Sequence, residues 1–71
     1  MDPALIQDHL ADAERHVSEG ERHVARQRDV VAELERAGHA SEAARMLLRH
    51  IEAWLELHVA DRDRLRQELR L

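Results

Sequence analysis

The segment Arg36-Ala37-Gly38-His39-Ala40-Ser41-Glu42 decides the fold of this chain. Gly38 fits the left-handed residue that commonly follows the C-terminus of a helix. Ser41 fits the N-cap of a second helix, and Glu42 is favourable in the first turn of that helix. We therefore predict a turn at about residues 38–41 between two helices. Because the turn is short, the two helices are expected to run antiparallel.

Helical sequence extends on both sides of this turn. Asp2 and Pro3 match an N-cap followed by proline at the first helical position, which predicts a helix over about residues 3–37. Gly20 is the only potential helix breaker between Pro3 and Ala37. After the turn, Ala, Leu, Arg and Glu dominate without interruption, which predicts a second helix over about residues 42–70. The expected fold is all-α, with one domain over residues 1–71.

Both predicted helices carry apolar residues at alternating spacings of three and four, which is the heptad pattern of a coiled-coil seam. In the first helix the seam comprises Ile6, Leu10, Ala13, Val17, Gly20, Val24, Gln27, Val31 and Leu34. In the second helix we assign the seam to Leu47, Ile51, Trp54 and His58, with Leu48, Leu55, Leu65 and Leu69 widening the stripe. This pattern predicts an antiparallel, coiled-coil-like two-helix hairpin.

The size of the chain predicts self-association. A single core in a chain of fewer than about 70–80 residues rarely contributes more than a few kcal/mol, and this chain has no cysteine for a disulfide. The apolar arc of the second helix is also too wide for one neighbouring helix to cover. We expect a homodimer that forms a four-helix bundle, with parallel and antiparallel hairpins both open. The expected interface residues are Val17, Val24, Val31, Leu47, Leu48, Ile51, Trp54, Leu55 and His58.

Three of the six histidines form a ladder with a seven-residue spacing: His9, His16 and His23. We expect them to flank the seam, with Asp12 four residues before His16 and Glu19 four residues before His23. Residues seven apart lie about 10.5 Å apart along a helix, whereas Zn–N bonds are only about 2.0 Å long. Two ladder histidines therefore cannot share one ion, and we expect no metal and no cofactor.

His58 is the one histidine placed within the predicted seam. In an antiparallel hairpin it comes close to Gly20, and glycine inside a helix costs about 1 kcal/mol relative to alanine. We therefore expect Trp54 or His58 to pack closely against Gly20. Because burial disfavours a charged ring, we also expect acid to weaken the assembly. If the chain does bind a metal, the weak candidates are His16, His23 and His58.

The sequence disfavours several classes of function. It contains no H-E-x-x-H, P-loop or G-x-S-x-G motif, so we expect no enzymatic activity. The net charge of −4, with arginines interleaved among acidic residues, disfavours binding to nucleic acid or to a membrane surface. The beginning Met1-Asp2-Pro3 does not resemble a secretory signal, and we expect a cytoplasmic location.

The segments 13–27, 33–39 and 57–65, which are rich in Arg and His, resemble a group of short helical proteins of proteobacteria. The resemblance implies a bacterial intracellular protein but no activity, ligand or catalytic residue. The leading hypothesis is a small non-enzymatic interaction or scaffold protein that acts as a homodimer or with another protein partner. The alternatives are a metal- or haem-binding bundle that uses His58 with the ladder histidines, and a small pH-responsive regulator.

Overall fold

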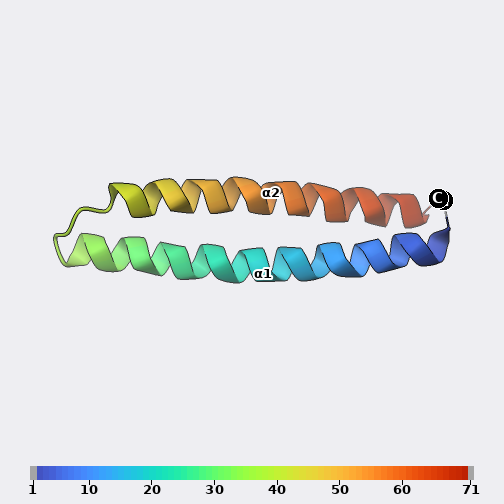
Figure 1. Cartoon of the computed structure of the whole chain (residues 1–71), viewed down its shortest axis with the longest axis horizontal. Coiled ribbons are helices and arrows are strands. Elements are labelled where there is room, and N and C mark those ends of the chain that lie inside the picture. The colour runs from blue at the N-terminus through green and yellow to red at the C-terminus, as the bar shows by residue number, and fades with distance from the viewer. Residues whose placement is uncertain (1, 71) are drawn as a thin grey trace.

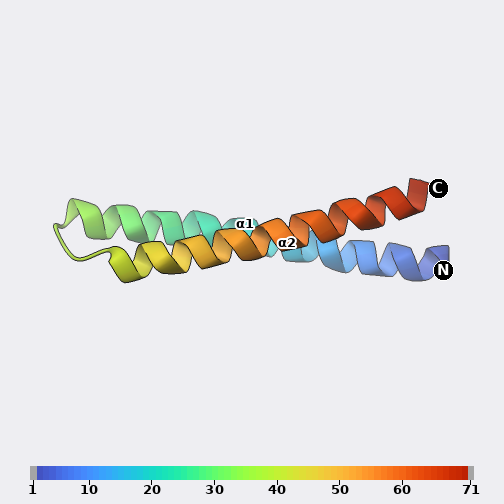
Figure 2. The same cartoon turned by 90° about the horizontal axis from the view of Figure 1, so that it is seen from above.

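The computed structural model describes residues 2–70 as two antiparallel helices, α1 (Pro3–Arg36) and α2 (Glu42–Arg70). Figure 1 shows the turn at one end of the molecule, and the start of α1 and the end of α2 at the other. The hairpin is a rod of 53 × 14 × 13 Å. Viewed from above, the helices cross at a shallow inclination, as in a coiled coil (Figure 2). The predicted all-α hairpin is confirmed.

The helix ends follow the expected chemistry. Asp2 caps α1, because its Oδ1 accepts a hydrogen bond from the Ala4 N–H at 2.9 Å. Beyond Arg36, Gly38 adopts φ 74°, and the His39 N–H donates to the Leu34 carbonyl at 2.9 Å. These features close the C-terminus of α1 with the left-handed glycine that the sequence predicted.

The seam of α1 agrees with the sequence pattern in full. Its buried residues are Ile6, Ala13, Val17, Gly20, Val24 and Val31. The remaining predicted positions, Leu10, Gln27 and Leu34, are half-buried. Gln27 also links the helices, because its Nε2 donates a hydrogen bond to the Ala44 carbonyl at 2.9 Å. The three-and-four spacing of small and β-branched residues was therefore sufficient to orient α1.

The assignment of Leu47 and Trp54 to the seam of α2 is wrong. Their side chains are 49% and 58% exposed. The residues of α2 and its N-terminal flank that face α1 are Ser41, Ala44, Leu48, Ile51, Leu55, His58, Arg62, Leu65 and Leu69, all of them buried or half-buried. Two heptad frames fit the wide apolar arc of α2, and both contain Ile51 and His58. Only the frame that includes Leu48 and Leu55 faces α1.

Gly20 of α1 faces Leu55 of α2 across the seam. A Cβ atom added at Gly20 would lie 2.9 Å from Leu55 Cδ1, which is closer than real Cβ contacts. The prediction that Gly20 makes room for a bulky neighbour is confirmed. The predicted neighbour is wrong, because Leu55 occupies the space that was assigned to Trp54 or His58. His58 lies one turn further along α2, beside His16.

Candidate functional site

The two long sides of the hairpin differ in chemistry. On one side, three ion pairs join α1 to α2, and we call this the ion-pair side. On the other side, Trp54 is exposed next to His58 and His16, and we call this the Trp54 side. Because residues seven apart lie along one line of a helix, His9, His23 and Val30 share the α1 edge of the Trp54 side with His16.

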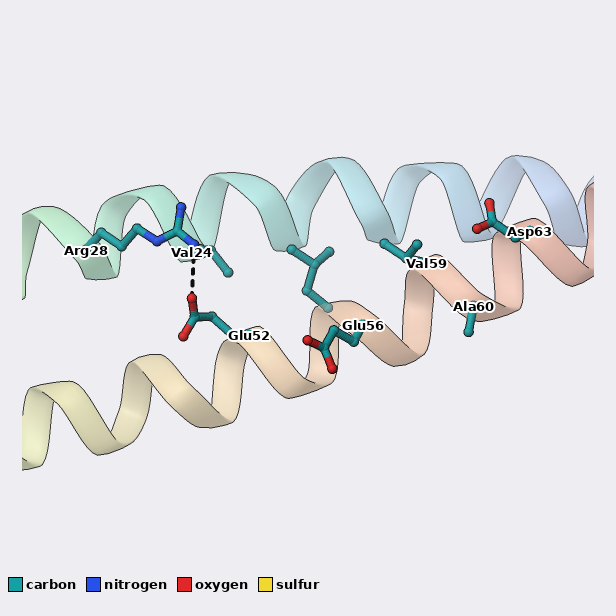
Figure 3. A pocket seen from close by; sticks show the side chains of 8 residues that line it. Val24, Arg28, Glu52, Glu56, Val59, Ala60 and Asp63 are labelled. Carbon is teal, nitrogen blue, oxygen red and sulfur yellow. Dashed lines mark hydrogen bonds and ion pairs between the residues drawn. The ribbon is translucent and has the colours of Figure 1, made fainter.

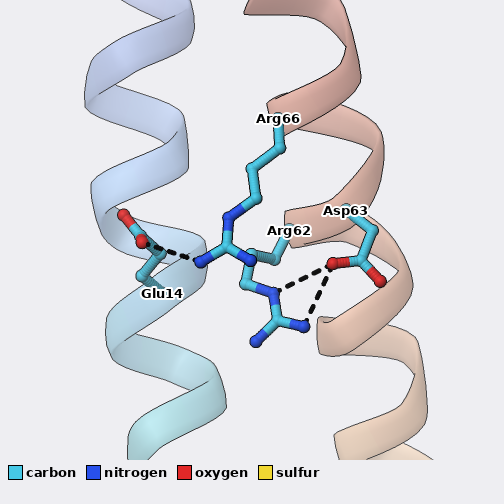
Figure 4. A network of polar contacts seen from close by, with 4 residues as sticks. All are labelled: Glu14, Arg62, Asp63 and Arg66. Carbon is cyan, nitrogen blue, oxygen red and sulfur yellow. Dashed lines mark hydrogen bonds and ion pairs between the residues drawn. The ribbon is translucent and has the colours of Figure 1, made fainter.

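The ion pairs are separated by multiples of seven residues along both helices. Their nitrogen–oxygen distances are 3.1 Å for Arg66–Glu14, 3.0 Å for Arg28–Glu52 and 3.5 Å for Arg45–Glu35. Figure 4 shows the Arg66–Glu14 pair crossing between the helices. All three pairs are solvent-exposed, so each contributes only about 0.2–1 kcal/mol. Their main effect is to favour this register over others.

One position in this series carries no ion pair. By the seven-residue spacing, the two residues at this position are Glu21 on α1 and Val59 on α2. A groove of about 440 Å³ lies here, with Val24, Leu55, Val59 and Ala60 in its lining. Figure 3 shows the Arg28–Glu52 pair at one end of the groove and Asp63 at the other. Val59 is thus apolar, whereas the other three α2 positions of the series, Arg45, Glu52 and Arg66, are charged.

Large apolar side chains are exposed along α2 on the Trp54 side. Their exposed fractions are 49% for Leu47, 58% for Trp54 and 69% for Leu57; Met46, on the face of α2 directed away from α1, is 52% exposed. Val30 on the neighbouring edge of α1 is 39% exposed. An exposed group of this kind on a small protein indicates an interaction surface.

A histidine pair lies beside this apolar group. The ring centroids of His16 and His58 are 5.1 Å apart, and the Trp54 ring meets the His58 ring edge-on at 4.5 Å. His58 Nε2 is buried and has no hydrogen-bond partner within residues 2–70. The ring therefore contributes mainly packing, between α1 and the indole of Trp54.

The ladder histidines His9, His16 and His23 are exposed on the α1 edge, as the sequence predicted. Asp12 pairs with Arg15 at 2.6 Å, although His16 was the expected partner. Asp61 of α2 accepts a hydrogen bond from Arg64, which raises the pKa of that guanidinium above its ordinary value.

The weak metal candidates are only partly brought together. His16 and His58 are adjacent, whereas His23 is one heptad away from His16. His9, Asp12, His16 and Asp61 line a pocket of about 210 Å³. Within the described part of the chain, however, no three His, Asp or Glu side chains are arranged to hold a metal ion.

The predicted interface residues fall into two groups. Those in contact between α1 and α2 of one chain are Val17, Val24, Val31, Leu48, Ile51, Leu55 and His58. Leu47 and Trp54 instead face outward on the Trp54 side. Met46 and Leu57 are also exposed, although the predicted interface does not include them. The seam frame of α2 would have revealed them, because a frame through Leu48 and Leu55 leaves them unpaired.

Comparisons with protein-family models, curated proteins and solved structures found no match to this chain. Neither helix, over residues 2–70, combines the length and the apolar character needed to cross a membrane.

Proposed function

We propose that this protein is a small non-enzymatic helical interaction or scaffold module that acts as a homodimer, with two hairpins forming a four-helix bundle. The observation that carries the proposal is Trp54, which is 58% exposed in the middle of the apolar group of α2. Tryptophan is enriched among the residues that dominate binding energy at interfaces. Burial of this group against a second copy removes it from water.

The exposed area of the single chain supports this proposal. A compact monomer of 8.3 kDa exposes about 4,600 Å², according to the usual scaling of surface with mass. The hairpin exposes 5451 Å². The difference is roughly 900 Å², so the elongated hairpin exposes more surface than a compact chain of its mass, and packing against a second hairpin reduces this excess.

The small core of the hairpin also supports association. Its buried hydrophobic residues are Ile6, Ala13, Val17, Val24, Val31 and Leu65. Most of them are small or β-branched, and within residues 2–70 no large side chain is fully buried. A core of this size leaves a chain of 71 residues marginal by itself. A second hairpin adds the apolar burial that the fold lacks.

The experiment is a comparison of two substitutions that each add one negative charge to α2. Trp54→Glu places the charge in the apolar group, and Gln67→Glu places it at an exposed position outside that group. We expect Trp54→Glu to raise the dimer Kd about 30-fold or more, because such a tryptophan contributes about 2 kcal/mol. Gln67→Glu should behave like the parent.

Multi-angle light scattering across a dilution series measures this difference. The parent and Gln67→Glu should have twice the chain mass of 8.3 kDa at concentrations where Trp54→Glu has the mass of one chain. Equal dimerisation of all three proteins, or a monomeric parent, would refute the proposal.

A further inference from the structure

The outward stripe of α2 on the Trp54 side is symmetric about the level of Glu52. Its positions are Ala43, Leu47, His50, Trp54, Leu57 and Asp61. The spacings between them are four, three, four, three and four, so they are the same in both directions along the helix. A second α2 that runs antiparallel therefore meets this stripe with matching positions.

This symmetry pairs residues of suitable character. When two copies of α2 cross at Glu52, Leu47 of one lies opposite Leu57 of the other. In the same way, Trp54 of one copy lies opposite His50 of the other. The most exposed large apolar side chain, Leu57 at 69%, is then covered by a leucine.

The angle around α2 between the stripe and the seam is also suitable for a four-helix bundle. Successive residues of a helix are about 100° apart, which places the centre of the stripe about a quarter-turn from the seam with α1. When the molecule is viewed along the axis of α2, the direction from α2 to a helix docked on the stripe is about 90° from the direction from α2 to α1. This is the arrangement of neighbours in a square four-helix bundle.

The charges of α2 favour the antiparallel direction. Beyond Leu57, the Trp54 side of α2 continues with Asp61, Arg64 and Glu68. A parallel pair of α2 helices would place each of these charges next to its own copy, which is repulsive. In the antiparallel pair, Arg64 and Glu68 lie beyond the start of the second α2 at Glu42.

We propose that two copies of this chain pack α2 against α2 in antiparallel orientation, around a twofold axis at the level of Glu52. This inference rests on the proposed homodimer and specifies its topology. The two α2 helices overlap over about 30 Å, given a rise of about 1.5 Å per residue.

The absence of cysteine from the chain permits a direct test by disulfide formation. Leu47→Cys and Leu57→Cys are prepared separately, one of them with a tag that changes its mass, and are then mixed and oxidised. In the antiparallel dimer, two copies of residue 47 lie about 15 Å apart along the helix axis, which is too far for a disulfide. Residues 47 and 57 of different copies lie side by side.

We expect the mixture to form a disulfide between Leu47→Cys and Leu57→Cys, while each variant alone stays reduced. Gln67→Cys, outside the stripe, provides the background level of random oxidation. Disulfide formation by Leu47→Cys alone or Leu57→Cys alone would show a parallel pair and overturn the inference. The inference is also overturned if the mixture gives only the background level.

A second pair of variants avoids the loss of large apolar side chains. Ala43→Cys and Asp61→Cys occupy the ends of the stripe and should also form a disulfide only when they are mixed.

Light scattering under reducing conditions separates the proposal of a homodimer from the proposal of its antiparallel topology. A monomeric parent overturns both of them, whereas a dimeric parent with a parallel disulfide pattern overturns only the topology.

Discussion

The ion-pair side and the Trp54 side flank the same seam but have opposite properties. The ion-pair side is closed within one chain, because three arginines of the hairpin meet three carboxylates across the helices. The Trp54 side leaves Leu47, Trp54 and Leu57 exposed to water. Exposed ion pairs contribute little energy but select the register, whereas burial of apolar area is the larger source of energy. Apart from the groove at Val59, the hairpin is therefore joined by ion pairs on one side, whereas large apolar side chains stay exposed on the other.

The largest expected effect separates two adjacent residues of α2. Leu55→Arg places a charge in the seam opposite Gly20 and should destabilise the hairpin by about 3 kcal/mol, enough to unfold it. Trp54→Arg places the same charge on the open side, where it weakens the dimer but leaves the seam intact, and should therefore cost less helix than Leu55→Arg. Circular dichroism melts of both variants measure this difference. Equal loss of helix in the two variants would contradict the assignment of seam and surface.

A smaller effect is expected at Gly20. Alanine improves helix propensity by about 1 kcal/mol, but its Cβ would lie 2.9 Å from Leu55 Cδ1, and overpacking typically costs about 1–3 kcal/mol. We expect Gly20→Ala to leave the melting temperature unchanged or to lower it. In a Leu55→Ala background the same change should become stabilising. A clear rise in melting temperature for Gly20→Ala in the parent chain would contradict the close contact.

The smallest expected effect completes the ion-pair side. Val59→Arg places a guanidinium at the position that the seven-residue spacing pairs with Glu21, and should stabilise the hairpin by about 0.2–1 kcal/mol at low salt. The gain should disappear in Val59→Arg combined with Glu21→Gln, and should fall as salt is added. Chemical denaturation at two salt concentrations measures it. A salt-independent gain would show that Glu21 is not the partner.

The sequence predicted α1 better than α2 for a physical reason. In α1 the apolar residues occupy one narrow line with charged residues on both sides, so only one heptad frame fits. In α2 the neighbouring leucines Leu47 and Leu48, and the neighbours Trp54 and Leu55, give two frames of similar hydrophobicity. Hydrophobic periodicity alone cannot choose between them. In the structure, the frame that faces α1 is the one that places Leu55 against Gly20.

The signal that would have resolved this ambiguity is the charge pattern. Glu14, Arg28 and Glu35 repeat at multiples of seven, and Arg66, Glu52 and Arg45 repeat in the opposite direction with complementary signs. Matching these two series fixes both the register and the side of α2 that faces away from Trp54. Of the candidate site, the sequence identified Leu47 and Trp54 but placed them in the seam. It could not show that His16 and His58 are adjacent, because that contact depends on the register.

The central claim is that the open side of the hairpin is covered by a second copy of the chain. Sedimentation equilibrium of the unmodified protein at micromolar concentration, near neutral pH, tests it most directly. The account predicts a reversible monomer–dimer equilibrium with a limiting mass of twice 8.3 kDa and a melting temperature that rises with concentration. A chain that stays at 8.3 kDa and melts cooperatively at a temperature independent of concentration would contradict it.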